Sequence, residues 1–362
     1  MKILYAIQGT GNGHLSRARD IIPILQKKGE VDILISGIQA DVDLPYPIKY
    51  RFKGLSFIFG KKGGIDLLAT YQKANLKQLF KEINSLPVEE YDLVISDFEP
   101  VSSWACKKKH KPCIGLSHQS AVINQKSPKP KKSDLVGSAV LRNYAPVTAS
   151  YGFHFEQYDE QIYTPVIRQQ IRDAKPQIQP HYTVYLPAYS DEKIIKTLSV
   201  CNQIEWEVFS KHSKKTYRIK NILIKPINNE AFIDSFINCT GILSGAGFET
   251  PAEALFLKKK LLVIPMKGQY EQQCNAAALK KMGVPVIKSL KKKNIPTIQD
   301  WLKNSQEITV NYPDNTLKII TNIIKVHGTE TSNKHVQLGD GIPTIKKLKA
   351  KTFGKILTQL AD

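Results

Sequence analysis

Short apolar runs alternate with longer amphipathic segments along most of the chain, a pattern typical of parallel strands connected by helices. In the first half, strands are predicted at 3–7, 31–36, 93–96 and 113–116, and helices at 16–28, 67–84 and 104–110. Such alternation favours a parallel sheet covered by helices on both faces.

The alternation weakens between residues 153 and 180, where prolines and charged residues accumulate, and we place an interdomain linker at 172–181. It then resumes, with strands predicted at 182–186, 205–209, 221–224, 241–243 and 261–264, and helices at 191–197, 230–237, 250–257 and 271–282. The sequence therefore predicts an α/β protein with two Rossmann-like domains, 1–172 and 181–328.

A polar, lysine-rich tail follows at 329–362. Residues 329–341 are expected to form a loop, and 342–360 a short basic amphipathic helix. We expect this helix to pack back on the body, with contact to a membrane surface as the alternative.

The formal net charge of +20 favours anionic partners, such as nucleic acid, acidic lipid or phosphorylated substrates. Five cysteines without a CxxC pair support neither a disulfide framework nor a zinc site, and reduced thiols in the cytoplasm are the expected state. A run of about 18 apolar residues is absent from the sequence, so any membrane contact is expected to be peripheral.

A glycine-rich loop follows the first strand, with the sequence Gln8-Gly-Thr-Gly-Asn-Gly-His14. Its glycines let the backbone approach a ligand closely, and the next helix points its N-terminus at that ligand. The G-x-G-x-G spacing departs from the dinucleotide fingerprint, and an acidic residue does not end the second strand, so NAD binding is disfavoured.

His14 stands at the mouth of the predicted sheet, where ligands of doubly wound folds bind. A histidine there can act as general base near neutral pH or can simply bind substrate. Another strand ends at Asp97, whose carboxylate would orient the imidazole if the two strands are neighbours. Glu99 is the alternative partner.

The strongest motif in the second half is Leu243-Ser-Gly-Ala-Gly-Phe-Glu-Thr-Pro-Ala-Glu253. A strand ends in a tight turn and a helix begins near Thr250, so free N–H groups from Gly247 to Thr250 would suit a diphosphate. Glu253 either caps this helix or reaches the two hydroxyls of a ribose. The following strand leads to Glu271 and Gln272, a carboxylate and an amide able to bind sugar hydroxyls.

Together, these two segments resemble the donor-binding signature of GT-B glycosyltransferases, which have two Rossmann-like domains facing across a cleft. The chain is similar to the lipid-intermediate N-acetylglucosaminyltransferase of peptidoglycan synthesis and to plant UDP-glycosyltransferases. The resemblance covers both domains, from the glycine loop to residue 279. The region 37–81, on the acceptor side, matches no recognisable pattern.

The resemblance implies an inverting sugar transfer from a nucleotide donor, most simply UDP-linked, without metal or other cofactor. His14 would be the catalytic base and Asp97 its orienting acid. The donor would be bound by Gly13, Ser190, Gly247, Phe248, Glu249, Thr250, Glu253, Glu271 and Gln272. Asn275 would brace the loop, and Glu249 is expected to point away from the phosphates because of its charge.

Two other functions are compatible with parts of the sequence. A nucleotide-sugar 2-epimerase shares the architecture and needs no acceptor. A non-enzymatic nucleic-acid binder would explain the charge, although the basic residues are scattered and no recognition motif is present, so no nucleic acid is expected. An acceptor that is a lipid or envelope glycoconjugate, at an anionic membrane surface, explains the charge more economically.

Overall fold

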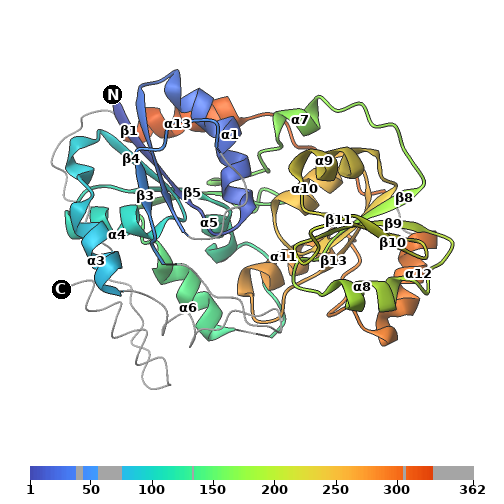
Figure 1. The fold of residues 1–362 in the computed structure, drawn as a ribbon. Coiled ribbons are helices and arrows are strands. Elements are labelled where there is room, and N and C mark those ends of the chain that lie inside the picture. Colours follow the sequence, from blue (N-terminus) through green and yellow to red (C-terminus); the bar gives the residue numbers. More distant parts are fainter. Residues whose placement is uncertain (38–43, 56–75, 133, 305–306, 329–362) are drawn as a thin grey trace.

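The computed structural model describes residues 1–37, 44–55, 76–132, 134–304 and 307–328, arranged as two α/β domains side by side (Figure 1). The predicted tail at 329–362, residues 38–43 and 56–75 of the acceptor-side region 37–81, and the first part of the helix predicted at 67–84 lie outside the described residues.

The first domain is built on a seven-stranded parallel sheet in the order β3-β2-β1-β4-β5-β6-β7. Its strands are β1 (Lys2–Gln8), β2 (Glu30–Ser36), β3 (Tyr50–Phe52), β4 (Leu93–Asp97), β5 (Ile114–Ser117), β6 (Ala149–Phe153) and β7 (Ile162–Tyr163). Its helices are α1 (Asn12–Gln26), α3 (Leu76–Ser85), the 3₁₀ turn η1 (Val88–Glu90), α4 (Pro100–Lys108), α5 (His118–Ile123) and α6 (Leu135–Tyr144).

The second domain contains a six-stranded sheet in the order β10-β11-β9-β8-β12-β13, parallel except for the β10–β11 pair. Its strands are β8 (His181–Tyr185), β9 (Glu205–Ser210), β10 (Tyr217–Ile219), β11 (Ile222–Pro226), β12 (Gly241–Gly245) and β13 (Lys260–Ile264). The remaining helices are α7 (Gln169–Arg172), α8 (Asp191–Leu198), α9 (Asn229–Asn238), α10 (Glu249–Phe256), α11 (Tyr270–Lys281), η2 (Lys292–Asn294), α12 (Ile295–Asn304) and α13 (Thr316–His327).

The central strands are apolar because helices cover both faces of each sheet. In β1, every residue from Ile3 to Ile7 has an exposed fraction of 0%. A strand that is buried on both faces reads as a continuous apolar run rather than an alternating one, which is why β1 was predictable from sequence.

Both sheets have a switch point, where the connections that follow two adjacent strands run to opposite sides of the sheet. In the first sheet it lies between β1 and β4, and in the second between β8 and β12. Ligands of open α/β sheets bind outside the carboxyl ends of strands at such points. A ligand site is therefore expected at the loops after β1 and β4 and at those after β8 and β12.

Three of the differences from the predicted elements bear on the site or on the domain boundary. Helix α1 begins at Asn12, so His14 lies in its first turn rather than in the loop, and Gly11 makes the turn with φ of 103°. The stretch between β5 and the linker contains α5, α6, β6 and β7, which were not predicted; β7 has only two residues.

The third difference concerns α13, which was predicted to belong to the second domain. It returns to the first domain and lies beside α1 (Figure 1). Its buried face of Ile319, Ile320 and Ile323 joins the same apolar cluster as α1, and His327 contacts the hydroxyl of Tyr151. Burial of this apolar face explains why the chain crosses back. Among the described residues, no helix has the length and apolar character needed to cross a membrane.

Candidate active site

His14 and Asp97 meet at the switch point of the first sheet, as the sequence predicted from neighbouring strand ends. β1 and β4 are paired in parallel, with Ile7 opposite Asp97. His14 Nδ1 lies 2.8 Å from Asp97 Oδ1, and the carboxyl is completely buried. Burial alone would raise the pKa of Asp97, but the charges of Arg17 and His14 outweigh it and hold that pKa below its usual value. Asp97 is therefore an ionised carboxylate that orients the imidazole.

Glu99, the alternative partner of His14, has a structural role. Its carboxylate accepts hydrogen bonds from the backbone N–H groups of Val101 and Ser102 at 2.7 and 2.6 Å and so caps α4. It also accepts from the Ser36 hydroxyl at 2.5 Å. Burial raises the pKa of Glu99. This alternative is therefore not supported.

Two polar residues missed by the sequence reading complete the first-domain side. Arg17, one turn after His14 on α1, donates to both oxygens of Asp97 at 2.7 Å. Gln119, in α5, places its Nε2 3.4 Å from His14 Nε2 and donates to Glu271 Oε2 at 3.0 Å. Arg17 could have been found from its spacing, because residues three positions apart on a helix, such as His14 and Arg17, lie on the same face. Gln119 gave no signal, because only the fold brings α5 to this edge.

The two domains are in direct contact beside this pair. The ring of His118 stacks on that of Phe248, with centroids 3.9 Å apart and an interplanar angle of 5°. Nδ1 of His118 bonds the carbonyl of Phe153 at 2.8 Å, and its Nε2 lies 2.7 Å from Asn275 Oδ1. Asn275 also donates to the carbonyl of Ala246 at 3.1 Å, so it braces the turn before α10. These contacts hold the glycine turn of the second domain against α5.

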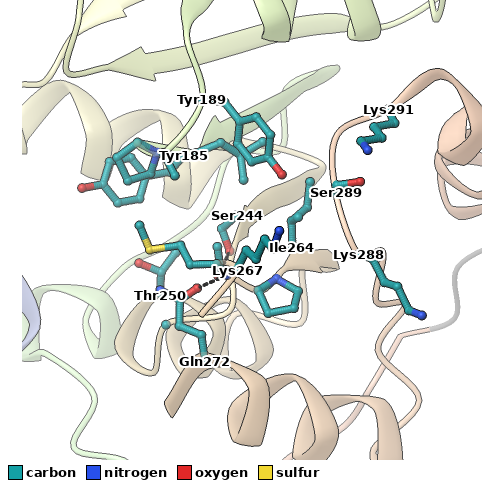
Figure 2. Close-up of a pocket in the computed structure, with 17 residues that line it drawn as sticks. Tyr185, Tyr189, Ser244, Thr250, Ile264, Lys267, Gln272, Lys288, Ser289 and Lys291 are labelled. Atoms are coloured by element: carbon teal, nitrogen blue, oxygen red, sulfur yellow. Dashed lines mark hydrogen bonds between the residues drawn. The ribbon is translucent and has the colours of Figure 1, made fainter. Parts of the chain in front are cut away.

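A cavity of about 670 Å³ opens at the carboxyl ends of β8, β12 and β13 (Figure 2). Three of the predicted donor-binding residues line it: Gly247, Thr250 and Gln272. Three lysines also do so, Lys267, Lys288 and Lys291, and the last two lie across the cavity from Thr250 and Gln272. The other lining residues are Tyr185, Leu186, Pro187, Ala188, Tyr189, Ser244, Gly245, Ile264, Pro265, Met266 and Ser289.

The chemistry of this lining suits an anion. Thr250 stands in the first turn of α10, where backbone N–H groups have no partner within the helix. Phe248, the N-cap residue, makes no side-chain capping hydrogen bond among the described residues. The charged residues that line the cavity are lysines. Helix N-terminus, hydroxyl and ammonium groups together can neutralise a diphosphate.

Other predicted donor residues have protein partners. Both oxygens of Glu253 accept from Arg168 at 2.6 Å, and the carboxylate, 2% exposed, neither caps α10 nor lines the cavity. A ribose contact would require this pair to open. Ser190 is the N-cap of α8, next to the cavity residue Tyr189. Gln272 accepts from the backbone N–H of Met266 at 2.9 Å, which orients its amide at the cavity.

Glu249 does point away from the cavity, as its charge led us to expect. It forms an ion pair with Arg17 of the first domain. Gly13, also predicted to bind donor, packs directly on this carboxylate, since a Cβ there would lie 2.5 Å from Glu249 Oε2. Gly13 thus allows α1 and α10 to approach each other.

Two Rossmann-like domains that meet at the carboxyl ends of their strands form the architecture of the GT-B glycosyltransferases. The model of glycosyl transferase family 1 matches residues 1–305. The chain therefore belongs to this glycosyltransferase family. No curated protein sequence matches it.

Solved structures with the same fold share little sequence with the chain. SnogD from Streptomyces nogalater is 11% identical, with a TM-score of 0.51, over 90% of this chain and 99% of that one. MurG of Acinetobacter baumannii is 13% identical, with a TM-score of 0.52, and the match covers 90% of this chain and 100% of MurG. UGT89C1 of Arabidopsis thaliana, complexed with UDP, is 11% identical, with a TM-score of 0.56, and the match covers 100% of this chain and 99% of UGT89C1. At these identities the likeness concerns the fold.

Proposed function

We propose that the protein transfers a sugar from a UDP-linked donor to an acceptor hydroxyl, with inversion and without a metal. The observation that supports this most is the placement of His14: its Nδ1 is held by Asp97, and its Nε2 faces Gln119 and, beyond it, Glu271 at the start of α11. The next residue, Gln272, lines the cavity. A donor sugar bound at the first turn of α11 would thus lie close to the base.

In the proposed reaction, the oxygen of the acceptor hydroxyl forms a bond to the anomeric carbon of the donor sugar. At the same time, His14 Nε2 takes the proton of that hydroxyl. The bond from that carbon to the diphosphate oxygen breaks on the opposite face, and UDP leaves. Asp97 stabilises the imidazolium that forms. The first turn of α10, Thr250 and the cavity lysines stabilise the charge on the leaving diphosphate.

We infer further that the acceptor is a lipid or envelope glycoconjugate reached at the cytoplasmic face of a membrane. Leu135, at the start of α6, is 78% exposed, and Lys131 and Lys132 are exposed beside it. An exposed apolar residue next to lysines suits an anionic lipid surface, where each lysine contributes roughly 1 kcal/mol. The protein should sediment with anionic vesicles at physiological salt, and Leu135→Glu should reduce this. Sedimentation no greater than with neutral vesicles would contradict the inference.

The donor site is tested by thermal denaturation with UDP, UDP-glucose, UDP-GlcNAc, TDP, GDP-mannose, NAD and an oligonucleotide. A ligand present at a concentration of 100 times its Kd should raise the free energy of unfolding of the protein by about 2.7 kcal/mol. We expect stabilisation by UDP or its sugars, reduced by half or more in Thr250→Val and retained in full in Thr297→Val, which changes an exposed threonine of α12. Stabilisation by NAD or oligonucleotide alone would overturn the proposal. Conversion of the donor to another sugar nucleotide without release of UDP would favour the epimerase.

A further inference from the structure

Arg17 joins two carboxylates that belong to different domains. Its Nη2 donates to both oxygens of Asp97 at 2.7 Å, and its Nη1 donates to Glu249. The Arg17 side chain is 1% exposed, Asp97 is fully buried, and Glu249 is 23% exposed. The guanidinium is thus enclosed between the partner of the proposed base and the first turn of α10.

This contact is one of those that set the distance between the two halves of the site, together with the stacking of His118 on Phe248. Glu249 lies at the start of the helix whose N-terminus faces the cavity, and Thr250 follows it. On the other side, Gly13 leaves no space for a side chain against Glu249. When Glu249 is seated on Arg17, the N-terminus of α10 is therefore tied to α1, the helix that carries His14.

The charges favour the three-residue arrangement over either pair alone. Burial would disfavour the charged form of Arg17, but Asp97 and Glu249 more than compensate and raise its pKa above the usual value. The planar guanidinium can bind one carboxylate at each edge, which a lysine ammonium cannot do in the same geometry. Asp97 in turn bonds His14, which also lies 3.2 Å from Arg17 Nη2. The orientation of the imidazole is thus linked to the seating of Glu249.

We propose that Arg17 is a positioning residue that aligns the His14–Asp97 pair when Glu249 docks on it, so that closure of the donor-binding domain prepares the base. The proposal rests on the proposed function for the role of His14. It gives Glu249 a role that involves no contact with the donor.

The test uses the full-length protein and four variants: Glu249→Gln, Arg17→Lys, the double variant, and Glu307→Gln as control. Glu307 is an exposed residue of the second domain, paired with Lys258. The rate of UDP release from a UDP-sugar and the Kd for UDP are measured for each. We expect Glu249→Gln to lose roughly 10- to 100-fold in kcat, the cost of a displaced base, while the Kd for UDP stays within about twofold.

The loss of kcat in Arg17→Lys should equal or exceed that in Glu249→Gln. The double variant should be no slower than Arg17→Lys, because both changes disrupt the same ion pair. Glu307→Gln should behave as wild type. A Kd for UDP weakened tenfold in Glu249→Gln with unchanged kcat would make Glu249 a donor ligand and overturn the proposal. Additive losses in the double variant would also overturn it.

A measurement independent of activity separates this proposal from the proposed function. Spin labels at Lys28→Cys and Lys303→Cys, exposed positions in different domains, report the interdomain distance, since the five native cysteines are buried. Glu249→Gln should broaden the distance distribution and Glu307→Gln should not. Identical distributions would contradict the link to closure. If wild type binds no UDP, the proposed function fails, and the distances still decide whether Arg17 and Glu249 hold the domains together.

Discussion

The two sides of the site differ in how their polar groups are used. On the first domain, His14, Asp97 and Arg17 are buried or nearly so and bonded to one another. In the cavity of the second domain, by contrast, the ammonium groups of Lys267, Lys288 and Lys291 lie on exposed side chains.

We interpret this difference as a separation of two proposed tasks, proton transfer on the first domain and donor binding on the second. Groups that move a proton must be held in one geometry before substrate arrives, and buried, mutually bonded side chains achieve this. Groups that bind an anion need bonding capacity left for the ligand, which the first turn of α10 and flexible lysines provide. Substitutions on the first domain should therefore affect rate and stability, and those in the cavity should affect affinity.

The largest effect is expected for His14→Ala. Loss of the proposed general base should slow UDP release from the donor by about 10²- to 10⁴-fold, with the Kd for UDP unchanged. The check is a steady-state assay paired with calorimetric titration of UDP. His110→Ala, which changes a histidine on the exposed turn after α4, serves as control. A rate within twofold of wild type would exclude His14 as the base.

Asp97→Asn should produce the largest loss of stability. Because Arg17 and His14 lower the pKa of Asp97, its ionised form stabilises the fold above the ordinary carboxyl range, and this contribution disappears as pH falls through the lowered pKa. Breaking this buried pair should cost about 3–5 kcal/mol at pH 7. The difference from wild type should shrink below about pH 4, where the unfolded carboxyl is protonated.

Urea denaturation between pH 3 and pH 8 measures this dependence, with the exposed Asp300→Asn in α12 as control. A difference between Asp97→Asn and wild type that stays constant over the whole range would mean that the carboxylate charge does not stabilise the fold.

A smaller effect, confined to binding, is expected for Thr250→Val. The hydroxyl lost is one that we assign to the diphosphate, and a hydrogen bond to a charged group contributes about 1.5–3 kcal/mol. The affinity for UDP should therefore fall roughly 10- to 100-fold, with thermal stability of the free protein nearly unchanged. Unchanged affinity by calorimetry would place the diphosphate elsewhere.

The smallest effect should come from the lysines. Changing Lys267, Lys288 and Lys291 together to alanine should weaken UDP binding only several-fold at low salt, because exposed charges act through solvent. At about 1 M salt the difference should vanish, since the Debye length is then only about 3 Å. A loss that persists at high salt would indicate direct, desolvated contacts.

The sequence predicted the parts of the site that depend on local order along the chain. The glycine loop, the strand ending at Asp97 and the turn before Thr250 each follow a buried apolar strand, so their meeting at the sheet edge was foreseeable. The interdomain contacts were not. Arg17 and Glu249 are 232 positions apart, and nothing local in either segment indicates the other. The return of α13 to the first domain was hidden for the same reason, because its apolar face does not specify its partner.

Calorimetric titration of UDP into wild type, Thr250→Val and His14→Ala tests most directly the claim that donor binding and catalysis lie on different domains. We predict that wild type and His14→Ala bind UDP with the same Kd and that Thr250→Val binds at least about 10-fold more weakly. Binding that is lost in His14→Ala but retained in Thr250→Val, or no binding of UDP at all, would contradict it.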